Sequence, residues 1–155
     1  MKIPSARNIA EILGLTGVIG SLIFVGVELD QNSAIARTAA YHQYVQGWSD
    51  YNLTMATDDK LNSLFVRVRE GQISKDFTPE ENSKLVFTYI SLVRQWEGVY
   101  RSVQEGILPP ELLYTFSSAR GLQQPAFVEK WPGMRFMFTQ DFLDFMENEV
   151  LNNEQ

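Results

Sequence analysis

The stretch Ile12–Val27 reads ILGLTGVIGSLIFVGV, which is sixteen residues without a charged side chain. As an α-helix rising about 1.5 Å per residue it covers about 24 Å, somewhat less than a bilayer hydrocarbon core of about 30 Å. Extending the span to Asn8 and Leu29 closes this gap and places Glu11 and Glu28 near its ends. Because the helix is apolar on every face, protein or lipid must enclose it.

Three interpretations of this helix compete. The first is an uncleaved membrane anchor, which we favour because four glycines in a water-soluble helix would cost about 1 kcal/mol each relative to alanine. The second is a buried core helix of a soluble bundle. The third is a secretory signal, with Lys2 and Arg7 before the apolar run and Ala34–Ala36 as the cleavage site, but the run exceeds the usual length.

Small residues on this helix suggest a packing face. Gly14, Gly17 and Gly20 recur at i, i+3 spacing, and Gly17 and Ser21 have the small-xxx-small spacing that lets helices approach closely in lipid. Basic residues precede the span and acidic residues follow it, so the positive-inside bias places the N-terminus in the cytoplasm. We therefore expect a single-pass membrane protein.

The remainder of the chain predicts helices only, because no segment alternates with period two. We expect an all-α fold in which an anchor at residues 1–32 precedes a compact bundle of about five or six helices at residues 33–155. Asp30–Ser33 allows either a break or one long helix. An aromatic stripe follows at helical spacing and is typical of core packing, although it is also compatible with an aromatic ligand wall: Tyr41, Tyr44, Trp48, Tyr51 and Met55.

Several helix ends carry recognisable signals. Thr78–Glu81 reads TPEE, a capping box with proline at the first helical position, and Gly71 and Gly106 are typical of helix C-termini. Pro125 opens a short helix that Pro132-Gly133 should stop, and Thr139 should cap the last helix.

Composition excludes much chemistry. The chain has no cysteine and one histidine, His42, so thiolate nucleophiles, iron–sulfur clusters and the usual zinc signatures have no support. Its formal net charge of -6 opposes binding to nucleic acid. No phosphate loop, nucleophile elbow or calcium loop is present. We accordingly expect no catalytic residue, no cofactor and no metal.

Polar residues within the helical faces leave two alternatives. Arg94 and Glu97 have i, i+3 spacing, and most such pairs are ordinary surface salt bridges worth about 0.2–0.5 kcal/mol. The sharper alternative is a pocket in which an arginine holds an anionic headgroup or carboxylate beside aromatic rings, oriented by Glu97. The candidate pocket residues are Arg67, Arg94, Trp96, Glu97 and Tyr100.

Parts of the sequence resemble an uncharacterised family of small bacterial proteins with one hydrophobic helix, a Gln-Asn-Thr-like turn and a helical domain. The N-terminal matches are Ala10–Ile12, Val18–Ile19, Ser21–Val25, Gln31–Ser33 and Arg37. The looser later matches are Gly106–Leu108, Glu111, Trp131, Phe138–Thr139 and Phe142. Ser33 stands where the family pattern has threonine. The resemblance implies a helical protein anchored in the bacterial inner membrane, and it brings no activity or cofactor.

Two functional hypotheses follow. The leading one is a membrane-anchored accessory or interaction subunit without catalysis, whose partners are membrane lipid and other membrane subunits or a second copy of itself. The alternative is a soluble or peripheral helical module that binds a lipid or another small apolar or anionic ligand between its helices.

Overall fold

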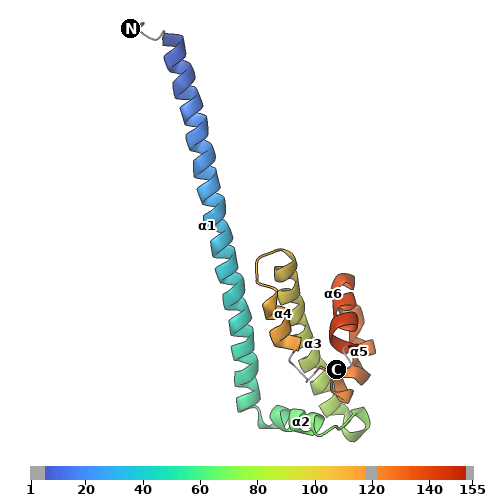
Figure 1. The fold of residues 1–155 in the computed structure, drawn as a ribbon. Helices are drawn as coiled ribbons and strands as arrows, with labels where there is room; N and C mark the ends of the chain where they lie inside the picture. The colour runs from blue at the N-terminus through green and yellow to red at the C-terminus, as the bar shows by residue number, and fades with distance from the viewer. Residues whose placement is uncertain (1–5, 118–121, 153–155) are drawn as a thin grey trace. The chain divides into compact units, whose positions relative to one another are not determined.

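The computed structural model describes residues 6–117 and 122–152. The described chain contains six α-helices and no strand, which confirms the all-α expectation (Figure 1). Three short turns complete it: 3₁₀ turns at Ser74–Asp76 and Arg135–Met137, and a π-helical turn at Met146–Leu151 that continues the last helix. The six helices are α1 (Ala6–Thr57), α2 (Asp59–Arg69), α3 (Pro79–Gln104), α4 (Glu111–Ser117), α5 (Pro125–Met134) and α6 (Gln140–Phe145).

The chain divides into two units, residues 1–39 and residues 40–155, and α1 contributes to both. In the N-terminal unit the helix continues through Asp30–Ser33, so the long-helix alternative is the one that forms. From Leu13 onward α1 is long and apolar enough to cross a membrane, with a mean hydropathy of 1.6 over its window of 18 residues. Every side chain of the segment 13–29 is exposed.

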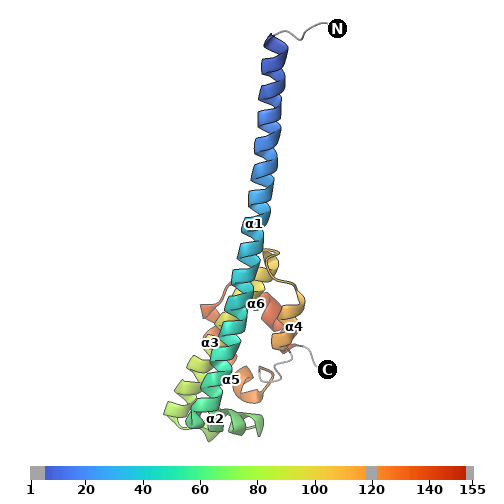
Figure 2. The same ribbon diagram turned by 90° about the vertical axis from the view of Figure 1, so that its left-hand side faces the viewer.

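The C-terminal unit, residues 40–155, is organised around α3. Leu85, Tyr89, Val93 and Trp96 recur every three or four residues along this helix, and all four are almost completely buried. Phe127 of α5 packs against Tyr89, and Phe142 of α6 packs against Trp96. Helix α2 lies across the end at which α3 begins, as both views show (Figures 1 and 2). The core is therefore a single cluster of large apolar side chains gathered by one long helix.

The last part of α1 adds partly buried side chains to this core. Tyr44 and Trp48 pack against it, and Tyr51 is half-buried. Tyr41 is 51% exposed, so the aromatic stripe predicted from the sequence is covered along only part of its length.

The helix ends follow the local signals closely. Thr78 accepts a hydrogen bond from the Glu81 N–H, and the Glu81 carboxylate accepts one from the Thr78 N–H, which completes the capping box. At the other end of α3, Gly106 has φ of 69°, and the Ile107 N–H bonds back to the Ser102 carbonyl in a Schellman motif. Gly71, with φ of 89°, ends α2 in the same way.

Two predicted helix signals act differently in the structure. Pro132-Gly133 does not stop α5, which runs on to Met134. Pro132 lacks the N–H of one helical hydrogen bond, and the burial of Trp131 and Met134 in the core retains the turn. Thr139 does occupy the N-cap of α6, but its hydroxyl makes no capping bond and instead donates to Glu97.

Candidate functional site

The Glu97 carboxylate joins α3 to the beginning of α6. Glu97 is only 3% exposed, so it is a buried charge rather than half of a surface pair. Its Oε1 atom accepts hydrogen bonds from the Thr139 N–H (2.9 Å) and the Thr139 hydroxyl (2.7 Å). Its Oε2 atom accepts from the Arg94 guanidinium at 2.6 Å. A buried carboxylate needs this kind of compensation, because leaving it unpaired would be strongly unfavourable.

These contacts set the charge state of Glu97. Burial alone would raise the pKa of its carboxyl group, but the hydrogen bonds from Thr139 and Arg94 outweigh burial, and the pKa is lowered. Arg94 also donates to the Met137 carbonyl, and its guanidinium stacks over the Phe138 ring, 4.9 Å from the centroid. With both ends of the guanidinium engaged, Arg94 acts as a cross-link between α3 and the segment preceding α6.

The two aromatic pocket candidates lie in different surroundings. Trp96 is completely buried, with edge-to-face contacts to Phe142 and Phe145, and therefore belongs to the core. Tyr100 borders a hollow of about 430 Å³ whose lining includes Asp141 and other acidic residues. Burial, followed by the charges of nearby carboxylates, raises the pKa of Tyr100. Such a hollow repels anions, so the surroundings of Tyr100 disfavour an anionic headgroup.

Arg67 lies in a separate network at the junction of α2 and α3. Its guanidinium donates to the Gln72 side chain, to the Glu81 carboxylate and to the Asp76 carbonyl, each at 2.7 Å. It also stacks over the Phe77 ring at 4.5 Å. The structure therefore brings Arg94 and Glu97 together but gives Arg67 a different set of partners, which hold the loop at residues 72–78 in place.

A second polar cluster fixes the same loop and was not identified from the sequence. The Lys130 ammonium donates to the Ser74 hydroxyl and to the Asn82 side-chain oxygen, both at 2.6 Å. Burial lowers the pKa of Lys130, and the neighbouring Glu129 opposes that effect. A serine beside a partly buried lysine is a combination found in nucleophilic catalysis. Here, however, the Ser74 N–H that would support an oxyanion donates to Glu129 at 2.8 Å, so the cluster fits a structural role.

The predicted packing face lies on the N-terminal unit. Gly14, Gly17 and Gly20 are exposed, and a Cβ atom added at any of them would meet no other atom within 4 Å. The Ser21 hydroxyl donates to the Gly17 carbonyl within the helix at 2.9 Å. Packing inside the described chain therefore does not require small residues at these positions.

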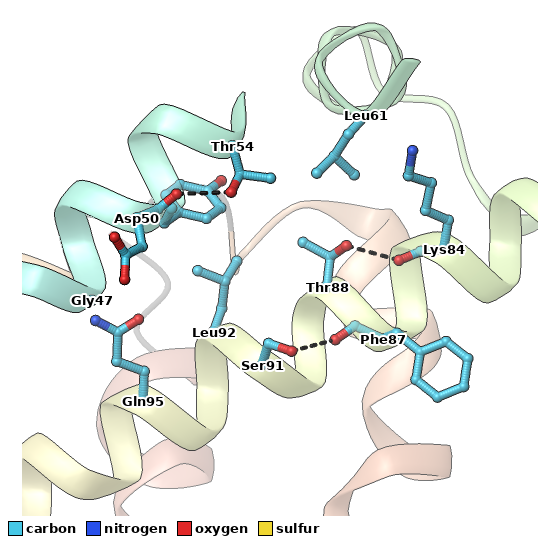
Figure 3. Close-up of a pocket in the computed structure, with 11 residues that line it drawn as sticks. Gly47, Asp50, Thr54, Leu61, Lys84, Phe87, Thr88, Ser91, Leu92 and Gln95 are labelled. Carbon is cyan, nitrogen blue, oxygen red and sulfur yellow. Dashed lines mark hydrogen bonds between the residues drawn. The ribbon is translucent and has the colours of Figure 1, made fainter. Parts of the chain in front are cut away.

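A groove of about 460 Å³ lies between the last part of α1 and α3, with α2 at one end (Figure 3). Leu61 and Leu92 point into it, and Phe87 turns away at its outer edge. The lining residues are Gly47, Asp50, Tyr51, Thr54, Leu61, Lys84, Phe87, Thr88, Ser91, Leu92 and Gln95. The sequence signal for this groove was weak, because Gly47, Thr88 and Ser91 are small residues that interrupt apolar helical faces without forming a motif.

The buried side-chain nitrogen of Gln95, a residue that lines this groove, has no hydrogen-bond partner within the described residues, and neither has the buried hydroxyl of Tyr89. Burial, and then the proximity of Tyr51, raises the pKa of Tyr89. The Gln95 amide lies against Gly47, where an added Cβ atom would overlap it. An unpaired buried donor of this kind costs about 1–3 kcal/mol.

Metal ligation finds no support in the part of the chain that the structure describes, where no group of three or more His, Asp or Glu side chains is placed to hold an ion. The arrangements found among the described residues are side-chain cross-links, an acidic hollow beside Tyr100 and a partly apolar groove between α1 and α3. Comparisons with protein-family models, with curated proteins and with solved structures found no match for the chain.

Proposed function

We propose that the chain is a single-pass protein of the bacterial inner membrane whose helical domain serves as an interaction or accessory subunit of a membrane assembly. The observation that carries this proposal is the exposed apolar run of α1, where Leu22 is 67% and Phe24 is 68% exposed. Burying a side chain of this size contributes about 1.5–3 kcal/mol, so the run strongly favours lipid over water. A core helix of a soluble bundle would instead be covered by its own chain.

The glycines support association within the membrane. Each glycine costs helix stability, and neither a positive φ nor a close internal contact requires one at Gly14, Gly17 or Gly20. Small residues of this spacing allow another transmembrane helix to approach closely. The partner helix belongs to a second copy of the chain or to another subunit of the assembly.

The proposed orientation places the N-terminus in the cytoplasm. Lys2 and Arg7 precede the span, and Glu28 and Asp30 follow it. The end of a membrane span that carries more basic residues stays on the cytoplasmic side. The helical domain, residues 40–155, then lies on the opposite side of the membrane.

Membrane integration is tested by extracting native membranes with alkaline carbonate. We expect the full chain to remain in the pellet, and a variant with Leu22→Asp and Phe24→Asp to move to the supernatant, because two charges near the middle of a span are costly. Release of the unaltered chain by carbonate would refute the anchor.

Association through the glycine face is tested by Gly17→Leu combined with Gly20→Leu. The matched control is Gly26→Leu, because Gly26 follows Gly17 by nine residues and lies about half a turn away around the helix. We expect the double variant to lose oligomers or co-purifying subunits in mild detergent, and the control to keep them. Equal behaviour of both variants would show that the glycine face is not the interface.

A further inference from the structure

The groove between α1 and α3 has the features of a site for a slender apolar ligand. Its volume of about 460 Å³ falls in the usual range of small-molecule sites, about 300–1,000 Å³. Leu61, Leu92 and the half-buried Tyr51 supply apolar walls. An α-helix with its side chains is about 10–12 Å wide, so this volume would hold only about one turn. The dimensions therefore favour an extended chain over a partner helix.

Hydrogen bonding indicates what the ligand must carry. The Gln95 side-chain nitrogen is buried against Gly47, beside the groove that Gln95 lines, without a partner within the described residues, and it can only donate. Rotation of the Gln95 side chain would turn this donor towards a ligand that supplies an acceptor oxygen, and the new hydrogen bond would remove the cost of leaving the donor unpaired. An unsubstituted hydrocarbon would not.

The charged groups that line the groove restrict the chemical class of the ligand further. Lys84 is the one cation among the residues that line the described groove, and it is already paired with Asp58 at 2.8 Å. Asp50 adds a carboxylate at the same end as Gln95. An anionic ligand head beside Gln95 would face this like charge, whereas an uncharged ester oxygen would not.

We propose that this groove binds the acyl chain of a neutral single-chain lipid of the monoacylglycerol class, whose ester carbonyl accepts a hydrogen bond from Gln95. The acyl chain lies between Leu61 and Leu92. This site belongs to the C-terminal unit and does not depend on how the N-terminal helix is used.

The proposal is tested with a monoacylglycerol that carries a photoreactive diazirine in its acyl chain. The full-length protein is mixed with phosphatidylcholine vesicles containing the probe, irradiated and mapped by peptide mass spectrometry. We expect labelling of residues 47–54 and 84–95, and competition by unlabelled monoacylglycerol but not by the same concentration of a fatty-acid anion. Labelling of residues 13–29 is scored separately, because it reports membrane insertion. The experiment therefore tests membrane insertion and lipid binding in the groove independently of each other.

A variant that fills the groove with a large side chain, compared with the same substitution outside the groove, tests whether labelling depends on the groove. Ser91 and Ser63 are both exposed serines whose hydroxyls bond a carbonyl of their own helix, but only Ser91 lines the groove. We expect Ser91→Phe to reduce labelling of the groove peptides at least tenfold and Ser63→Phe to leave it unchanged. Thermal unfolding of both variants verifies that they fold.

The variant Gln95→Leu distinguishes a groove that binds a ligand from a groove that is merely a packing gap. It removes the unpaired donor, so labelling should fall by about threefold to tenfold, while the melting temperature of the ligand-free protein rises. Groove labelling that Ser91→Phe and Gln95→Leu both leave unchanged overturns the proposal. So does labelling no stronger than that around Ser63, which would mean that water alone occupies the groove. Equal competition by the fatty-acid anion overturns the assignment of a neutral head.

Discussion

Glu97 holds the C-terminal unit together by a buried charge. Its two oxygens serve three donors, two from Thr139 and one from Arg94. The carboxylate thus acts at the beginning of α6, where the Thr139 hydroxyl makes no capping bond of its own. Negative charge near a helix N-terminus is favourable, and here it comes from a neighbouring helix.

We expect Glu97→Gln to lower the free energy of unfolding by about 2 kcal/mol, because hydrogen bonds to a charged group are worth about 1.5–3 kcal/mol. The amide keeps the shape of the side chain but loses the charge and turns one acceptor into a donor. Urea unfolding of the purified chain measures the loss. Glu105→Gln, an exposed position at the end of the same helix, should change stability by less than about 0.5 kcal/mol. Similar losses in both variants would contradict the role of Glu97.

At the scale of the element, α3 contains two kinds of glycine. Gly98 lies inside the helix, and a Cβ atom added there would meet nothing within 4 Å. Gly106 follows the helix with φ of 69°, a conformation that other residues adopt only at a cost. The same substitution should therefore have opposite effects at the two positions.

We expect Gly98→Ala to raise the free energy of unfolding by about 0.5–1 kcal/mol, through better helix propensity. Gly106→Ala should lower it by about 1–2 kcal/mol, because alanine pays the left-handed penalty. Urea midpoints of the two variants measure the difference. A higher free energy of unfolding for Gly106→Ala, or a lower one for Gly98→Ala, would mean that local backbone conformation does not determine the effect of these substitutions.

For the whole molecule, hydrogen-bonded carboxylates predict how stability depends on pH. A hydrogen bond from Lys84 lowers the pKa of Asp58, and one from the Thr78 N–H lowers that of Glu81. The pKa of Glu97 is also lowered, against the effect of burial. Each group is easier to protonate in the unfolded chain, so the unfolded state gains protons first as the pH falls.

We therefore expect stability to be constant between pH 7 and about pH 5 and to fall below that. The decline begins near the unfolded-state pKa values of about 3.9 for Asp and 4.3 for Glu, and it continues towards the lower values of the folded state. Urea unfolding at pH 7, 5, 4 and 3.5 tests this. Glu97→Gln should make the acid decline shallower, and stability that rose on acidification would contradict the sign.

Local signals predicted much of the fold because they depend on few neighbours. The capping box at Thr78 and Glu81 and the glycine ends of two helices formed as expected, since each needs only a backbone turn and one or two side chains. Pro132 was different. Whether a helix passes a proline depends on the packing of its flanks, and in α5 the buried Trp131 lies directly before it.

The candidate site was less accessible to sequence reasoning. Spacing along one helix places Arg94 and Glu97 together, but it cannot show that Thr139, 42 residues away, buries the carboxylate. Likewise, no local pattern brings Lys130 to Ser74 or places Gln95 beside Gly47. These contacts depend on how separate helices pack.

The all-helical class, the ends of α3 and the run apolar enough to cross a membrane follow from local sequence, because propensity, capping and hydrophobicity act within a few residues. Helix packing, in contrast, sets which charges are buried and where a groove remains. Burial and cavities arise only when helices distant in sequence meet, and so Glu97 became a buried cross-link and Gln95 an unpaired donor at the groove.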